Sequence, residues 1–184
     1  PEAQRDRFLM KILLGYPSPL EELEIVNRMG VTPPTPSEVL SPADVKRLQA
    51  AAEQCYCDRS VVEYAVNLVL ATRTPQNYGL ADLNQYLEFG ASPRASLGLV
   101  RAGRAMALLR GRNYVVPQDI FDVAPEIMRH RLVLTYEALA ADVDAEAIMM
   151  RVLSTVPAPV IQPTHIAGPT DAYYQSATDA RAWG

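Results

Sequence analysis

Residues 90–119 read GASPRASLGLVRAGRAMALLRGRNYVVPQD, and this stretch decides the expected fold. Ser92 suits a helix cap, and Pro93 suits the first helical position, where its missing N–H costs no hydrogen bond. Gly111 ends this helix, and Pro117 begins the next one after a short turn, so two neighbouring antiparallel helices are predicted. The apolar face of the first helix follows steps of four, three, four and three: Ala95, Leu99, Ala102, Met106 and Leu109.

Similar start signals occur on both sides of this stretch, with proline after two of the caps: Ser18-Pro19, Ser41-Pro42 and Asp58. Residues 59–73 are apolar on most of their surface, which favours a place at the centre of a helical bundle. Residues 75–91 have little periodicity and are expected to form a long loop with a helical turn around 80–86. The expected helices are 19–29, 42–54, 59–73, 93–110, 117–124, a short one starting at Pro125, and 144–155.

The two ends of the chain differ from this helical pattern. Residues 8–14 form a short apolar run closed by Gly15, which predicts a buried strand. A strand needs neighbours, so the rest of its sheet is expected upstream of Pro1, in a longer protein; the missing initiating Met supports the same expectation. Residues 32–36 form a proline-rich linker, and residues after 156 are expected to form a flexible tail.

Composition narrows the class of protein. The chain has 184 residues, 49% of them hydrophobic, which is enough for a real core and argues against a wholly disordered protein. A net charge of −4 gives no sign of the basic surface typical of nucleic-acid binders. The most apolar run, residues 61–71, is too short and too polar for a membrane helix. With two cysteines and no leader sequence, the expected location is the cytoplasm.

Several kinds of chemistry find no support in the sequence. There is no G-x-x-x-x-G-K-[ST] loop, so this chain alone is not expected to hydrolyse nucleotide. No serine lies in a G-x-S-x-G elbow. His130 and His165 are far apart and lack neighbours at metal-ligand spacing, so no metal site is predicted.

Two arginines are the candidate functional residues. Arg94 projects from the first turn of a predicted helix, where unpaired backbone N–H groups already favour an anion such as phosphate. Arg101 and Arg104 extend a basic face along the same helix, although solvation or pairing with acids of a neighbouring helix explains these two equally simply. Arg7 stands directly before the predicted strand, at the rim of a sheet where α/β sites form, and a surface ion pair with Asp6 or Glu2 is its simpler explanation.

Several blocks of the sequence, in order, resemble the MoxR family of AAA+ ATPases. The blocks are Pro1–Phe8 (PEAQRDRF), Gly15–Pro19 (GYPSP), Ala71–Arg73 (ATR), Gly90–Ser96 (GASPRAS), Leu109–Asp119 (LRGRNYVVPQD) and Arg129–Leu132 (RHRL). The resemblance covers about residues 1–156.

The resemblance implies a mainly α fold, in which a helical-bundle AAA+ lid follows one short strand of the α/β core. It assigns residues 1–36 to the end of the core, 37–156 to the lid and 157–184 to a tail. It makes Arg94 the sensor-2 arginine, which contacts the γ-phosphate of ATP, and Arg7 the arginine finger, which reaches the nucleotide of the adjacent subunit. A positioned guanidinium stabilises the charge that phosphoryl transfer spreads over these oxygens.

For the parent protein, the resemblance implies ATP and Mg²⁺ as cofactors and a chaperone-like ring, with a hexamer as the expected form. It also implies a partner that carries a von Willebrand factor A domain, and neither a membrane span nor nucleic-acid binding. The 184 residues alone are expected to be inactive and to hold no tightly bound cofactor. The alternative is a stand-alone helical module that binds an acidic partner or nucleic acid through the face of Arg94, Arg101 and Arg104.

Overall fold

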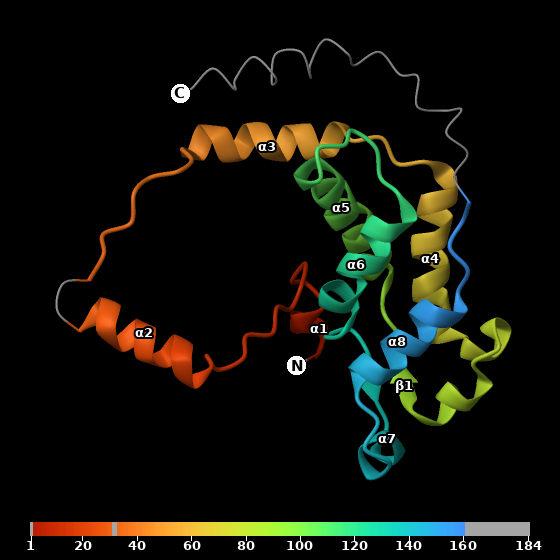
Figure 1. The fold of residues 1–184 in the computed structure, drawn as a ribbon. Helices are drawn as coiled ribbons and strands as arrows, with labels where there is room; N and C mark the ends of the chain where they lie inside the picture. The colour runs from red at the N-terminus through yellow and green to blue at the C-terminus, as the bar shows by residue number, and fades with distance from the viewer. Residues whose placement is uncertain (1, 31–32, 161–184) are drawn as a thin grey trace.

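The computed structural model describes residues 2–30 and 33–160, and most of them are helical (Figure 1). The helices are α1 (Glu2–Arg5), α2 (Pro19–Met29), α3 (Pro42–Gln54), α4 (Arg59–Arg73), α5 (Pro93–Leu109), α6 (Pro117–Met128), α7 (Tyr136–Ala140) and α8 (Ala145–Thr155). Two 3₁₀ turns, η1 (Pro75–Tyr78) and η2 (Ala81–Gln85), and two strands, β1 (Leu87–Phe89) and β2 (Val133–Leu134), complete the described part.

The predicted helix starts are confirmed where a side chain caps the helix. Ser18, Ser41 and Ser92 each accept a hydrogen bond from a backbone N–H of the first turn, and each is followed by proline. Asp58 and Asp144 cap α4 and α8 in the same way. These caps satisfy N–H groups that have no partner within the helix.

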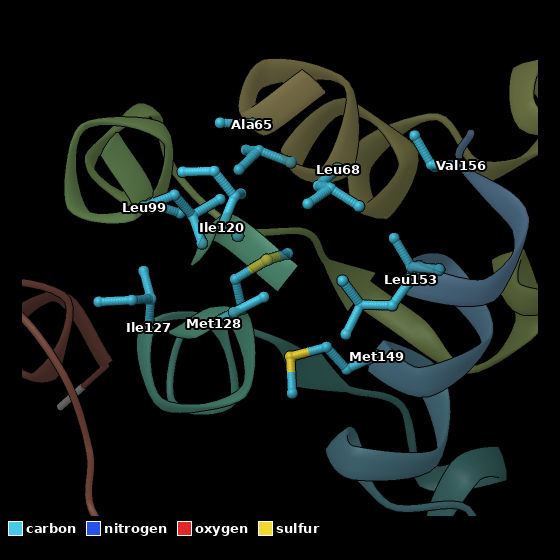
Figure 2. Packing of buried hydrophobic residues seen from close by; sticks show 14 of the residues in the cluster. Ala65, Leu68, Leu99, Ile120, Ile127, Met128, Met149, Leu153 and Val156 are labelled. Atoms are coloured by element: carbon cyan, nitrogen blue, oxygen red, sulfur yellow. The ribbon is translucent and has the colours of Figure 1, made fainter. Parts of the chain in front are cut away.

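The core lies between α4, α5, α6 and α8 (Figure 2). Helix α4, expected at the centre of the bundle, buries one face in this core and exposes Glu63 and Asn67 on the other. Leu68 of α4 and Leu99 of α5 have no exposed surface. The close-up shows the core side chains of the four helices pointing toward one another, with these labelled: Ala65, Leu68, Leu99, Ile120, Ile127, Met128, Met149, Leu153 and Val156.

A small antiparallel sheet connects the long loop to the segment after α6. Leu87 of β1 lies opposite Leu134 of β2, and Phe89 lies opposite Val133, with an irregularity between the two pairs. Thr135, the cap of α7, donates from its hydroxyl to the Gln85 carbonyl at 2.6 Å. The sequence did not predict β1, β2 or α7, because each is only two to five residues long and depends on contacts with a distant segment.

The prediction of a buried strand at residues 8–14 is wrong for this structure. These residues form no ladder with any described residue and are exposed, with Leu14 93% exposed. Strand geometry needs a neighbouring strand, and here the backbone finds other partners: the Lys11 N–H donates to the Glu126 carbonyl at 2.8 Å. The chain then leads to α2, which stands clear of the bundle and has no buried residue (Figure 1).

Helix α6 is longer than predicted. The sequence suggested that one helix ends at Ala124 and another begins at Pro125, but α6 continues through Pro125 to Met128. Proline removes one hydrogen bond from a helix interior. Burial of Ile127 and Met128 beyond the proline, both without exposed surface, compensates for that loss.

The turn between α5 and α6 is organised by one enclosed carboxylate, that of Asp119. It accepts hydrogen bonds from Arg112 at 2.6 and 2.8 Å, from Arg110 at 2.9 Å and from the Val116 N–H at 2.9 Å. Burial alone would raise the pKa of Asp119, but the bonds from Arg112 and Val116 and the charge of Arg112 outweigh it, and the pKa lies below its ordinary value.

No helix within residues 2–30 and 33–160 combines the length and the apolar character needed to span a membrane. The tail predicted to be flexible falls largely in residues 161–184, which lie outside the described residues.

Replacing Gly90 with alanine should destabilise the bundle. A Cβ at this position would lie 2.3 Å from the carbonyl oxygen of Thr72, a backbone atom that cannot move aside cheaply. We expect Gly90→Ala to lower the free energy of unfolding by about 1–3 kcal/mol, measured by thermal or denaturant unfolding. The matched control is Gly15→Ala, where a Cβ meets nothing within 4 Å and the change should stay within about 0.5 kcal/mol. Equal stability of the two variants would contradict the close approach.

Replacing Asp119 with asparagine should cost stability in a pH-dependent way. Because its folded pKa is lowered, the carboxylate stabilises the fold above its unfolded pKa of about 3.9, and this contribution disappears as pH falls through the folded pKa. We expect Asp119→Asn to cost about 3 kcal/mol at pH 7 and progressively less below pH of about 4, measured as the Tm difference from wild type. Glu63→Gln, which breaks the exposed Arg59–Glu63 pair, is the control with little effect. A Tm difference that does not change with pH would contradict the ionic role of Asp119.

Candidate functional site

Arg94 lies in the first turn of α5, as the sequence predicted. Its backbone N–H donates to the Ser92 hydroxyl at 3.2 Å, and its guanidinium donates to a carboxylate oxygen of Asp6 at 3.3 Å. The side chain is 55% exposed, so solvent and small ions can reach the guanidinium. The site therefore combines a helix N-terminus with an accessible positive charge, which together favour an anion.

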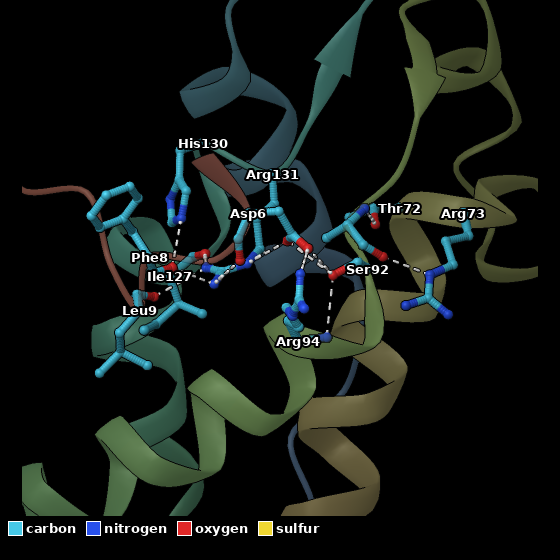
Figure 3. Close-up of polar contacts among 11 residues, drawn as sticks. Asp6, Phe8, Leu9, Thr72, Arg73, Ser92, Arg94, Ile127, His130 and Arg131 are labelled. Carbon is cyan, nitrogen blue, oxygen red and sulfur yellow. Dashed lines mark hydrogen bonds and ion pairs between the residues drawn. The ribbon is translucent and has the colours of Figure 1, made fainter. Parts of the chain in front are cut away.

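Asp6 is where the polar contacts of the site converge (Figure 3). Its carboxylate accepts from the Ser92 hydroxyl at 2.9 Å on both oxygens, from Arg94, and from Nε of Arg131 at 3.1 Å. One carboxylate thus lies between two guanidinium groups and the cap of α5. Asp6 and Arg131 are 125 positions apart in sequence, so this contact joins the start of the chain to the end of α6.

Arg131 is the enclosed member of the cluster, with a side chain only 2% exposed. Besides Asp6 Oδ1, its guanidinium donates to four backbone carbonyl oxygens: Asp6 at 3.2 Å, Phe8 at 2.6 Å, Leu9 at 3.1 Å, and Ile127. Burial lowers the pKa of Arg131, the Asp6 carboxylate opposes that shift, and the charge of Arg94 adds to it. Arginine stays protonated through such shifts, so Arg131 clamps residues 6–9 to α6 as a cation.

The two residues before Arg131 extend this clamp. Arg129 donates to the Lys11 carbonyl at 2.9 Å and to Glu146 of α8 at 2.7 Å. Nε2 of His130 lies 3.2 Å from the Phe8 carbonyl. Burial lowers the pKa of His130, so the ring is neutral at pH 7, and Nε2 carries the proton because a carbonyl can only accept. Residues 129–131, quoted above only as part of a family block, together hold residues 6–11.

The start of α5 is also fixed from its other side, by the end of α4. The Ala91 N–H donates to the hydroxyl of Thr72 at 3.0 Å, and Nε of Arg73 donates to the Ala91 carbonyl at 2.6 Å. Ala91 itself has no exposed surface. The residues just before the Ser92 cap therefore have little freedom to move, and the first turn of α5 is a rigid support for Arg94.

Arg7, the second predicted site residue, is exposed, and its side chain makes no hydrogen bond or ion pair within residues 4–30 and 33–160. The pairing with Asp6 considered from the sequence is not formed, because Asp6 binds Arg94 and Arg131 instead. Arg7 thus directly follows the residue that contacts Arg94. The structure thus places Arg94 in the Asp6 cluster and leaves the Arg7 side chain outside it, with both guanidinium groups open to solvent.

The basic face predicted for α5 is not continuous. Arg104 donates to the Glu53 carbonyl near the end of α3 at 3.3 Å, whereas Arg94 turns to Asp6. Arg101 is exposed and makes no side-chain hydrogen bond or ion pair within the described ranges. Arg94 and Arg104 bind different neighbours, which does not favour a single surface for an acidic partner or nucleic acid.

Sequence reasoning missed Asp6 and Arg131 as parts of the site. The sequence shows both as charged residues within family blocks, but no local periodicity links two residues that are 125 positions apart. An arginine directly before the apolar pair Leu132-Val133 is the single local signal, because an arginine beside buried residues needs partners.

Comparison with known proteins gives consistent matches. The family described as AAA lid domain matches residues 80–152. The chaperone MoxR1 of Mycobacterium tuberculosis is 53% identical over 161 residues, covering 88% of this chain and 43% of that protein. Protein MoxR of Methylorubrum extorquens is 34% identical over 173 residues, covering 86% of this chain and 50% of that protein.

A solved structure extends these matches to three dimensions. The crystal structure of a candidate ATPase from Cytophaga hutchinsonii superimposes with a TM-score of 0.83 and 37% identity, covering 87% of this chain and 49% of that one. The predicted mainly helical fold with an AAA lid is therefore confirmed. The chain spans about half the length of the relatives that it matches.

Replacing Arg131 with methionine should release the start of the chain. Methionine fills a similar volume but donates no hydrogen bonds, so four carbonyl groups and Asp6 would lose a donor. We expect a loss of about 3 kcal/mol in the stability of the clamp and faster trypsin cleavage after Arg7 and Lys11, measured by mass spectrometry. The control is Arg151→Met, which breaks the half-exposed pair with Asp82 and should leave both cleavage rates unchanged. Equal cleavage of the two variants would show that Arg131 does not hold the segment.

Proposed function

The chain belongs to the MoxR family of AAA+ ATPases, and from this we propose that it supplies the helical lid and two arginines to the ATP site of a chaperone-like ring ATPase. We assign residues 37–156 to the lid and residues 1–36 to the end of the α/β core. Support for the lid comes from the family match at residues 80–152. Support for the boundary comes from α3, whose Glu53 carbonyl accepts a hydrogen bond from Arg104 of α5, whereas α2 stands clear of the bundle (Figure 1).

The observation that carries the proposal is the position of Arg94. Its guanidinium is half exposed, at the first turn of a 17-residue helix whose start is fixed by contacts with α4 and Asp6. An ATPase needs a positive group that meets charge as it develops on the γ-phosphate oxygens, and a preorganised donor does this without a reorganisation cost. Arg94 in the role of sensor 2 matches that requirement.

We propose Arg7 as the arginine finger that reaches the nucleotide of an adjacent subunit. It is exposed, and its side chain is not engaged by any residue within 4–30 and 33–160. A finger supplied from a neighbour must be free to leave its own subunit's surface, and a finger contributes about 10³ to 10⁵ in rate where this has been measured.

ATP with Mg²⁺ is the cofactor that we propose for the whole protein. The half-exposed guanidinium of Arg94 fits a phosphate group, and ATP supplies the reactive phosphoanhydride bond. The sequence has no G-x-x-x-x-G-K-[ST] loop, and the described residues hold no group of three His, Cys, Asp or Glu placed for a metal ion. The phosphate cradle and the Mg²⁺ ligands must therefore come from other residues of the assembly, and we expect these 184 residues alone to be inactive.

The proposed assembly is a cytoplasmic ring, with a hexamer as the expected form, and a partner that carries a von Willebrand factor A domain. Similarity to a protein named chaperone MoxR1 supports the chaperone-like role. The role proposed for Arg7 requires a ring, because this finger acts on the nucleotide of a neighbouring subunit.

Replacing Arg94 with alanine in the full-length protein encoded by the gene should lower ATP turnover by about 10²- to 10³-fold, the effect of removing one preorganised donor. Arg7→Ala should have an effect at least as large. Phosphate release in the presence of Mg²⁺ is the measurement. Arg101→Ala is the matched control, because Arg101 lies on the same helix two turns further along, is exposed, and should leave turnover unchanged.

Unchanged turnover in Arg94→Ala, with the fold confirmed by circular dichroism, would remove Arg94 from the mechanism. A large loss in Arg101→Ala would instead point to a general effect of positive charge on α5.

A further inference from the structure

We propose that Asp6 is a positioning residue that holds Arg94 in a resting place, and that ATP must draw Arg94 away from it. This inference rests on the proposed function. Asp6 touches neither substrate nor metal in the proposal and acts only through Arg94. It was not among the residues that the sequence singled out as functional.

The two arginines on Asp6 are held very differently. Arg131 is 2% exposed and is fixed by four further bonds, to the backbone carbonyl oxygens of residues 6, 8, 9 and 127. Arg94 is 55% exposed, and its single contact to Asp6, at 3.3 Å, is the longest made by that carboxylate. Solvent screens a contact of this kind, whereas an enclosed charge keeps its partners. Arg94 is therefore the arginine that can leave.

The departure of Arg94 leaves no unpaired buried charge. Asp6 keeps Nε of Arg131 at 3.1 Å and the Ser92 hydroxyl at 2.9 Å, so its carboxylate remains neutralised and hydrogen-bonded. A phosphate group carries more negative charge than one carboxylate, so it attracts the Arg94 guanidinium more strongly. The same guanidinium can thus exchange one anion for another at low cost.

Asp6 is also connected to both candidate arginines. Arg7 follows Asp6 directly in the chain, so the carboxylate that holds Arg94 fixes the backbone from which Arg7 projects. When Arg94 moves to a phosphate, one of the contacts that restrain Asp6 is lost. Binding of nucleotide is therefore expected to loosen the segment that carries Arg7.

The test is Asp6→Asn in the full-length protein, with kcat and KM for ATP measured separately. Asparagine keeps the size but removes the charge that competes with ATP for Arg94, so KM should fall by about 3- to 10-fold, the range of a partly exposed ion pair. The kcat should stay near the wild-type value, because Arg94 has already left Asp6 when ATP is bound. Asp6→Glu, which keeps the charge, should restore KM to near the wild-type value.

The matched control is Asp82→Asn, which removes an aspartate paired with Arg151 of α8 and should change neither constant. The decisive variant combines two changes: on an Arg94→Ala background, Asp6→Asn should no longer alter the affinity for a fluorescent ATP analogue. An equal rise in affinity in both backgrounds would overturn the proposal, because Asp6 would then act independently of Arg94.

If Asp6→Asn does not fold, a second measurement tests the proposal without that variant. Hydrogen exchange of residues 4–11 in the wild-type protein should rise when a non-hydrolysable ATP analogue binds, and the analogue should cause no rise in Arg94→Ala. Slower or unchanged exchange in the wild type would contradict loss of the Arg94 contact to Asp6. If Arg94→Ala has normal turnover, the proposed function fails; if Arg94→Ala is impaired but Asp6→Asn behaves like Asp82→Asn, only the role of Asp6 fails.

Discussion

The enclosed guanidinium of Arg131 is the interaction on which the site depends. A charge that is 2% exposed must find partners for its N–H groups, and Arg131 finds them in the Asp6 carboxylate and in carbonyl groups of residues 6, 8, 9 and 127. Such a cluster fixes one path for the start of the chain across the end of α6. The position of Asp6, and through it the resting position of Arg94, follows from this requirement.

A second constraint acts from α4. Thr72 and Arg73 bind the backbone of Ala91 from the end of that helix, and Gly90 passes so close to Thr72 that a side chain has no room. The start of α5 is thus held between the end of α4 and the Asp6 cluster. The phosphate contact proposed for Arg94 requires a support that does not move, and these two sets of contacts supply that support.

The sequence predicted the local features well and the distant ones poorly. Caps such as Ser92 and Asp144 act within one turn, so the starts of α5 and α8 could be located from neighbouring residues alone. Residues 8–14 were misjudged because an apolar run does not reveal whether a neighbouring strand is available. Pro125 was misjudged because burial of Ile127 outweighed a local preference.

The candidate site shows the same division. Arg94 could be found from the sequence because it directly follows Ser92 and Pro93, which mark the start of a helix. Asp6 and Arg131 could not be found in this way, because their role depends on a contact between residues 125 positions apart. The positioning residues of a site are generally hidden in this way, since they act through contacts between elements and not through a motif.

The most direct test of the central claim is a structure of the full-length protein with Mg²⁺ and a non-hydrolysable ATP analogue. We expect the Arg94 guanidinium within hydrogen-bond distance of a γ-phosphate oxygen and no longer on Asp6, while Arg131 keeps its bond to Asp6. An occupied nucleotide site with Arg94 still paired to Asp6 and another residue on the γ-phosphate would contradict it.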